Sequence, residues 1–199
     1  MRNKLPPGLS QILSVRITAG DFPLMKPTLV LAMTLSFLAA NLSAQETSAP
    51  GKVPTKRVAF AQSCFWTGEM KLGQIEGVVR TEAGFLGGRE VTLVEYAPDR
   101  IQLDDLARQA RQAGVADSVH LETTSSRALA GVSSGAPLDR SYRAAPASDQ
   151  KKQIEGTPFS RLDLSPEQAT KVNAFVRADS GKALGYLTPP QREQLKSGK

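Results

Sequence analysis

Residues 57–96 read RVAFAQSCFWTGEMKLGQIEGVVRTEAGFLGGREVTLVEY, and the spacing of apolar residues changes repeatedly along them. Positions 57–62 are short and apolar-rich, which predicts a buried strand. Positions 65–76 carry apolar side chains at nearly helical spacing and end at a glycine, which predicts a helix. Positions 78–88 and 90–96 then predict two strands joined by a glycine-rich turn.

Two further elements continue this pattern. Residues 101–114 place their apolar side chains on one side of a helix and end at Gly114. Residues 117–124 fit another short strand. The order β-α-β-β-α-β predicts an α+β fold with a ferredoxin-like, split β-α-β core. A generic α+β layer with a different strand pairing is the alternative.

The C-terminal part of the chain has a different character. Residues 125–160 are rich in Ser, Ala and Gly without a sustained period, which predicts a loop that wraps over the core. Residues 165–178 and 188–198 each begin with a capping residue followed by proline, and Ser165 and Thr188 are the predicted caps. We expect these two segments to form a small C-terminal helical appendix.

Residues 29–40, LVLAMTLSFLAA, form an uncharged apolar run that is too short for the roughly 20 residues of a membrane-spanning helix. Lys26 precedes the run and the small residues Ser43 and Ala44 follow it, as in a secretory signal cleaved after Ala44. Met25 begins a normal signal by itself, so the residues before it are interpreted as an upstream extension. We predict an exported, periplasmic or otherwise extracytoplasmic protein with no stable membrane span after cleavage. A retained N-terminal anchor is the alternative.

Composition and these signals divide the chain. The predicted parts are residues 1–44 (extension and signal), 45–55 (a polar linker), 56–146 (the core domain) and 147–199 (the helical extension). The net charge of +6 comes from scattered lysines and arginines, and no zinc-finger or RNA-binding signature accompanies them. This pattern favours a solvated basic surface, so we predict no nucleic-acid partner.

Cys64 is the sole cysteine of the chain and therefore cannot form an internal disulfide. Its predicted place is between a strand end and a helix start, where unpaired N–H groups favour the thiolate, the reactive form of cysteine. Phe65 and Trp66 would supply an apolar wall beside the sulfur. The alternative is that Cys64 is an inert core residue and that the two aromatic rings only pack.

Residues 63–88, SCFWTGEMKLGQIEGVVRTEAGFLGG, resemble the signature of the A-type peptide methionine sulfoxide reductases. That signature has G-C-F-W, a glutamate five residues past the cysteine, then G-V, T and G-Y-x-G-G. The matching positions, without a gap, are Cys64, Phe65, Trp66, Glu69, Gly77, Val78, Thr81, Gly84, Gly87 and Gly88. Phe85 stands where the family has tyrosine. The resemblance covers about residues 56–146 and is strongest in this segment.

The resemblance implies a set of site residues and a reaction. Cys64 falls on the family's nucleophile and Glu90 on its catalytic glutamate, while Phe65, Trp66 and Tyr142 fall on substrate-binding positions. The implied activity is reduction of methionine S-sulfoxide in peptides or proteins, through a cysteine sulfenic acid. An external thiol, thioredoxin-like or small, would then resolve that acid. We expect no bound cofactor and no metal, and the implied partners are the oxidised substrate and the thiol reductant.

The sequence also departs from the family. A loop that follows G-Y-x-G-G is missing, together with a tyrosine that helps to bind the sulfoxide oxygen. Pro137 occupies the position of a family aspartate, Ser63 replaces a glycine, and the chain has no second, resolving cysteine. His120 alone makes no metal site, and Glu69 is interpreted as a structural or capping carboxylate. A non-catalytic binding or redox-sensing module on the same fold is therefore the alternative function.

Overall fold

The computed structural model of the chain describes residues 54–123, 129–139 and 141–198. The predicted secretory signal lies outside these ranges, as do positions 45–53 of the predicted linker. The division between a core domain and a helical extension stays a prediction. None of the helices in the described ranges has the length and apolar character needed to cross a membrane.

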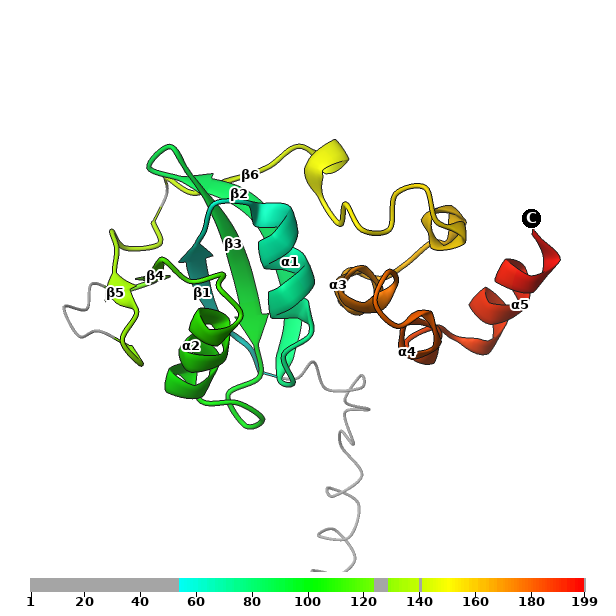
Figure 1. The fold of residues 1–199 in the computed structure, drawn as a ribbon, viewed down its shortest axis with the longest axis horizontal. Helices are drawn as coiled ribbons and strands as arrows, with labels where there is room; N and C mark the ends of the chain where they lie inside the picture. Colours follow the sequence, from blue (N-terminus) through cyan, green and yellow to red (C-terminus); the bar gives the residue numbers. More distant parts are fainter. Residues whose placement is uncertain (1–53, 124–128, 140, 199) are drawn as a thin grey trace, which may run out of the picture. The chain divides into compact units, whose positions relative to one another are not determined.

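The elements follow the predicted β-α-β-β-α-β order and then add two edge strands (Figure 1). They are β1 (Lys56–Ala61), α1 (Phe65–Gly73), β2 (Val78–Leu86), β3 (Arg89–Tyr96), α2 (Leu103–Gln112), β4 (Ser118–Leu121), β5 (Ser133–Ser134) and β6 (Arg143–Ala144). In the described residues the sheet order is β5-β4-β1-β3-β2-β6. β3 lies between β1 and β2 and is antiparallel to both, and β4 is antiparallel to β1. This is the split β-α-β arrangement, and the predicted α+β fold is confirmed.

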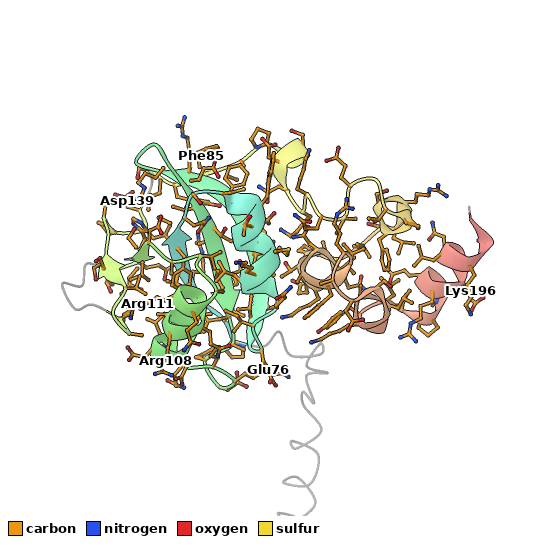
Figure 2. The ribbon with its side chains drawn as sticks, in the orientation of Figure 1. Glu76, Phe85, Arg108, Arg111, Asp139 and Lys196 are labelled. Atoms are coloured by element: carbon orange, nitrogen blue, oxygen red, sulfur yellow. The ribbon has the colours of Figure 1, made fainter. Side chains whose placement is uncertain are left out.

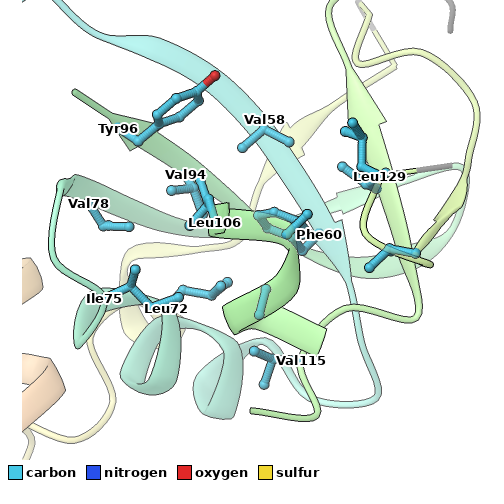
Figure 3. Close-up of a cluster of buried hydrophobic side chains, with 14 of the residues drawn as sticks. Val58, Phe60, Leu72, Ile75, Val78, Val94, Tyr96, Leu106, Val115 and Leu129 are labelled. Atoms are coloured by element: carbon cyan, nitrogen blue, oxygen red, sulfur yellow. The ribbon is translucent and has the colours of Figure 1, made fainter. Parts of the chain in front are cut away.

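Helices α1 and α2 share one core with the sheet (Figure 3). Phe60 from β1, Leu72 from α1 and Leu106 from α2 are completely buried in it. Burial of a side chain of this size contributes roughly 1.5–3 kcal/mol. Because side chains alternate along a strand, Ala59 and Ala61 face the other side of the sheet, where they belong to a second cluster. The face that carries α1 and α2 is called the helical face below.

Helix α1 ends at Gly73, before the end that the sequence predicts. Its neighbour, α3 (Pro166–Phe175), explains the difference. The Lys171 ammonium donates hydrogen bonds to the carbonyl oxygens of Gly73 (2.8 Å) and Ile75 (3.2 Å). The Gln74 side-chain amide donates to a carbonyl oxygen of α3 at 2.8 Å. Lys171 thus gives the last carbonyl group of α1 a partner from α3.

The two predicted C-terminal helices are present as α3 and α5 (Pro189–Ser197), and Ser165 and Thr188 both form complete capping boxes. A short helix between them, α4 (Ser180–Gly185), is absent from the sequence prediction. Six residues that include two glycines give no helical period to detect. A separate apolar cluster, which includes Phe159, Val172, Phe175 and Leu187, holds this region together.

The described part of the segment predicted as a loop, residues 129–139 and 141–160, forms mostly short, irregular structure, and residues 125–128 and 140 lie outside the described ranges. Its exceptions are β5, which pairs in parallel with β4, and β6, which pairs antiparallel with β2. Two 3₁₀ turns, Ala147–Asp149 and Pro158–Arg161, follow β6. Strands of two residues have no periodicity, so the sequence could not indicate them.

A buried ion pair fastens the segment after β6 to α1. Glu69 of α1 is completely inaccessible to solvent, and it accepts hydrogen bonds from the backbone N–H (2.7 Å) and the ammonium of Lys151. The same ammonium donates to the carbonyl oxygen of Thr81 in β2 at 2.6 Å. These contacts confirm the interpretation of Glu69 as a structural carboxylate.

We predict that Lys151→Met lowers the free energy of unfolding by about 3 kcal/mol, because it leaves the Glu69 carboxylate buried without its cation. The double variant Glu69→Gln/Lys151→Met should recover at least half of this loss, since no charge then remains buried. Urea unfolding followed by circular dichroism measures both values. Equal stability of Lys151→Met and the unchanged chain would contradict the prediction.

Lys171 makes the stability depend on pH. Its burial, followed by repulsion from Lys182, lowers the pKa of Lys171 to about 8, against an ordinary value of 10.5. Between these two values the unfolded chain binds the proton more tightly than the folded chain. The cost of burying the charged amine is therefore present below pH 8 and disappears as the pH rises toward 10.5.

This pH dependence can be measured as the free energy of unfolding of the wild-type protein minus that of Lys171→Met. We predict that this difference rises by about 1–2 kcal/mol between pH 7.5 and 10.5. The hydrogen bonds that the variant lacks are missing at every pH, so they do not contribute to the rise. Denaturant titrations at several pH values measure the difference. A difference that stays flat or falls with pH would refute the assignment.

Candidate active site

Cys64 lies at the junction that the sequence predicts, between β1 and the first residue of α1. It is the N-cap residue of the helix, with extended backbone angles (φ −148°, ψ 114°), and its side chain makes no capping hydrogen bond to the described residues. The thiol is free and partly exposed. The sulfur is therefore beside unpaired helix N–H groups and within reach of solvent, as nucleophilic chemistry requires.

Glu90 comes from the second position of β3, and its carboxylate reaches the start of α1. The Oε2 atom accepts a hydrogen bond of 2.8 Å from the backbone N–H of Phe65, the residue next to Cys64. In the β2–β3 pairing Glu90 lies opposite Phe85, so both side chains project from the helical face. The structure thus brings Glu90 to the residue that follows Cys64, although Cys64 and Glu90 are 26 positions apart in the chain.

Three aromatic rings lie beside this pair. Phe65 is buried and makes edge-on contacts with Trp66 (6.0 Å between ring centroids) and Phe85 (5.5 Å). Phe85 and Glu76 lie at opposite ends of the sheet (Figure 2), and Glu76 follows the C-terminal end of α1. Trp66 is 37% exposed, so an apolar surface remains open to solvent next to the thiol. Such a surface suits an apolar substrate group.

Buried polar side chains fix the start of α1 against β3. The side chains of Gln62 and Thr92 are hydrogen-bonded at 3.0 Å, and the Thr92 hydroxyl also contacts the Phe65 carbonyl oxygen at 3.4 Å. Gly68 lets the helix approach this closely, because a Cβ atom there would lie 2.2 Å from the Thr92 hydroxyl. Sequence reasoning missed all these supporting residues. A glycine inside a predicted helix was the one signal of close packing.

Tyr142 lies on the face of the sheet opposite to Cys64. It packs with the cluster that contains Ala61 and Leu86, and its hydroxyl donates to Glu82 Oε1 at 2.6 Å. Burial, with this hydrogen bond, raises the pKa of Tyr142 well above its usual value, so the hydroxyl stays a proton donor. Gly84 gives the ring its space, since a Cβ there would lie 2.6 Å from the Tyr142 hydroxyl. The structure does not bring Tyr142 together with Cys64.

His120 also has a structural environment. Its ring is buried, with Nδ1 2.7 Å from the carbonyl oxygen of Ala136 and Nε2 3.0 Å from the Ser118 hydroxyl. Both ring nitrogens are thus occupied by protein atoms. In the described ranges no group of three or more His, Cys, Asp or Glu side chains is placed to hold a metal ion.

The fold and this site define an α+β protein with a partly exposed thiol at a helix start, a neighbouring carboxylate and an aromatic surface. No protein-family profile matches the chain. A peptide methionine sulfoxide reductase from Pseudomonas syringae pv. tomato is 38% identical over 66 residues, which covers 25% of this chain and 31% of that protein. The chain therefore spans about a third of the length of the curated relative that it matches.

Among solved structures, the methionine sulfoxide reductase A of Corynebacterium diphtheriae is similar to 69% of this chain and 63% of its own. The TM-score is 0.30 and the sequence identity 19%, a likeness too slight to support an argument. The sequence relative is what confirms the resemblance of this chain to the A-type peptide methionine sulfoxide reductases, as a divergent protein.

The site geometry predicts how the Glu90 charge affects reagents that approach Cys64. A carboxylate near the thiol repels an anionic reagent, so at low salt Glu90→Gln should raise the rate of alkylation by iodoacetate, relative to the rate with neutral iodoacetamide, roughly three- to tenfold. Glu95→Gln, which removes the same charge from the far end of β3, is the matched control and should leave this ratio unchanged. Mass spectrometry of the labelled chain follows both reactions. An unchanged or lower ratio in Glu90→Gln would show that the carboxylate does not act near the sulfur.

Proposed function

We propose that this protein reduces methionine S-sulfoxide in peptides or proteins to methionine, with Cys64 as nucleophile and Glu90 as acid. The observation that carries the proposal is the hydrogen bond between the Phe65 backbone N–H and Glu90, because it holds a carboxylate next to the thiol. The partial sequence relative supports the same chemistry. The substrate, the reductant and the export that the sequence predicts are parts of this proposal.

The first step is attack of the Cys64 thiolate on the sulfur of the sulfoxide. The helix start favours the negative charge on the attacking atom, and partial exposure lets the substrate approach. A bond forms between the two sulfur atoms, and the electron pair of the S–O bond moves toward oxygen. Trp66 and Phe85 offer apolar surface to the methyl group on the substrate sulfur.

The second requirement is a proton for the sulfoxide oxygen. Glu90 would supply it by passing on the proton that the Cys64 thiol loses, and its hydrogen bond to Phe65 keeps the carboxyl group at the residue that follows the nucleophile. The bond between the two sulfur atoms then breaks, its electron pair stays on the substrate sulfur, and the hydroxyl oxygen ends on the Cys64 sulfur, which leaves methionine and a cysteine sulfenic acid. Two external thiols reduce this acid to the free thiol, and release water and a disulfide. Since Cys64 is the sole cysteine, the electrons must come from outside the chain.

One observation favours the alternative of a non-catalytic, redox-sensing module. Tyr142, which falls on a substrate-binding position of the family and could offer its hydroxyl to the sulfoxide oxygen, donates instead to Glu82 on the opposite face of the sheet. Without such a donor the developing charge on oxygen has less stabilisation. In a sensor, Cys64 would be oxidised directly and reduced by a thiol, with no release of methionine.

Incubation of the full chain with a methionine S-sulfoxide peptide and excess dithiothreitol tests the proposal. We expect repeated turnover, its loss in Cys64→Ser, and a fall of about 10²–10⁴-fold in kcat for Glu90→Gln. Glu95→Gln is again the matched control and should retain activity. The R epimer of the sulfoxide should be turned over poorly.

Two results would reject the proposal for a correctly folded chain. The first is no methionine from either epimer, with Cys64 still oxidised by peroxide and recovered by thiols, which is the behaviour of the redox sensor. The second is activity that persists in Cys64→Ser.

A further inference from the structure

Lys152 holds a positive charge directly over the exposed ring next to the candidate nucleophile. Its Nζ atom lies 5.4 Å from the centroid of the Trp66 ring, a cation–π distance. The neighbouring Lys151 is fixed by its buried ion pair with Glu69, so the backbone that carries Lys152 has a defined place. This cation is therefore part of the surroundings of Cys64.

Arg143 brings a second cation to the same face of the sheet. It lies opposite Phe85 in the β2–β6 pairing, so its side chain projects from the helical face, as those of Phe85 and Glu90 do. The residue is exposed at the edge of the sheet. The aromatic surface is thus bordered by Arg143 on β6 and by Lys152 on the segment that follows.

The existing partners of Lys152 do not remove its charge from solvent. It forms an ion pair with Glu155, whose side chain is 66% exposed, and donates to the Ser148 carbonyl oxygen at 3.3 Å. An exposed pair of this kind contributes little free energy. An acidic group on an incoming chain can therefore replace Glu155 at low cost.

We propose that Lys152 and Arg143 form a cationic border that selects oxidised methionine flanked by acidic residues. This inference rests on the proposed function, since it names the class of substrate for the same site. The acidic side chains would approach the two cations while the oxidised methionine lies on Trp66. Charge of this kind chiefly raises the association rate and the specificity, and salt weakens it.

The first test compares three methionine S-sulfoxide peptides that differ only in the flanking residues, Glu, Gln or Lys. At low ionic strength we expect kcat/KM to fall in that order, by roughly threefold or more at each step. In 0.5 M NaCl the three values should converge. Equal values at low salt, with normal turnover, would overturn this inference and leave the proposed function standing.

A matched pair of variants assigns the effect to Lys152. Lys152→Met should reduce the ratio between the Glu and Lys peptides at least threefold, and Lys152→Arg should preserve it. Lys196→Met is the control, because Lys196 on α5 also pairs with a glutamate three residues away and lies far from Phe85 (Figure 2). An equal loss in both methionine variants would show a general charge effect and overturn the role of Lys152.

Trp66 is the sole tryptophan, so its fluorescence reports on this site without catalysis. Iodide should quench Trp66 about twofold less in Lys152→Met than in the unchanged chain, whereas quenching by neutral acrylamide should be equal. The acidic peptide should also perturb the emission at a lower concentration than the basic one. If the acidic peptide is preferred but no peptide is turned over, the inferred selectivity stands and the proposed reaction fails. If the acidic and basic peptides bind equally well, the inferred selectivity is overturned.

Discussion

The hydrogen bond from the Phe65 amide to Glu90 connects the start of α1 with β3, and the site depends on it. It satisfies one of the unpaired N–H groups of the helix and places a carboxylate beside the only thiol. A helix start that lay elsewhere on the sheet would leave Cys64 with favourable backbone dipoles but no acid. The chemistry proposed for this protein needs both groups in one place.

The close approach of α1 to β3 has a specific cause. Gly68 has no side chain where the Thr92 hydroxyl lies, and Gln62 and Thr92 pair beneath the helix. A larger residue at position 68 would force the helix away and separate Phe65 from Glu90. The position of the carboxylate is therefore set by packing inside the domain as much as by its own hydrogen bond.

The same helix also anchors the chain that follows the sheet. Glu69, five positions after Cys64, binds Lys151 in a buried ion pair, and Lys152, which follows Lys151, lies over Trp66. The reactive group thus lies at the start of α1, and Glu69 within the same helix fixes the segment that borders it. The C-terminal region is consequently part of the surroundings of the site, although its helices have their own apolar cluster.

Much of the fold could be predicted from the sequence, because strand and helix periods and the capping boxes at Ser165 and Thr188 are local signals. The contacts that complete the site are not local. Gln62 and Thr92 are 30 residues apart and Glu69 and Lys151 are 82, so no short pattern reports them. The face of the sheet on which Tyr142 lies depends on how the two-residue strand β6 pairs with β2. A shift of that pairing by one residue would turn every side chain to the opposite face of the sheet. The resemblance located Glu90 near the thiol, but it could not fix that register.

The most direct test of the account is a single turnover without reductant. When the full chain is mixed with an excess of methionine S-sulfoxide peptide, we expect one equivalent of methionine per chain. In the same reaction Cys64 should gain one oxygen atom as a sulfenic acid, which dimedone traps and mass spectrometry locates. Methionine released without oxidation of Cys64, or no methionine from a folded chain, would contradict the account.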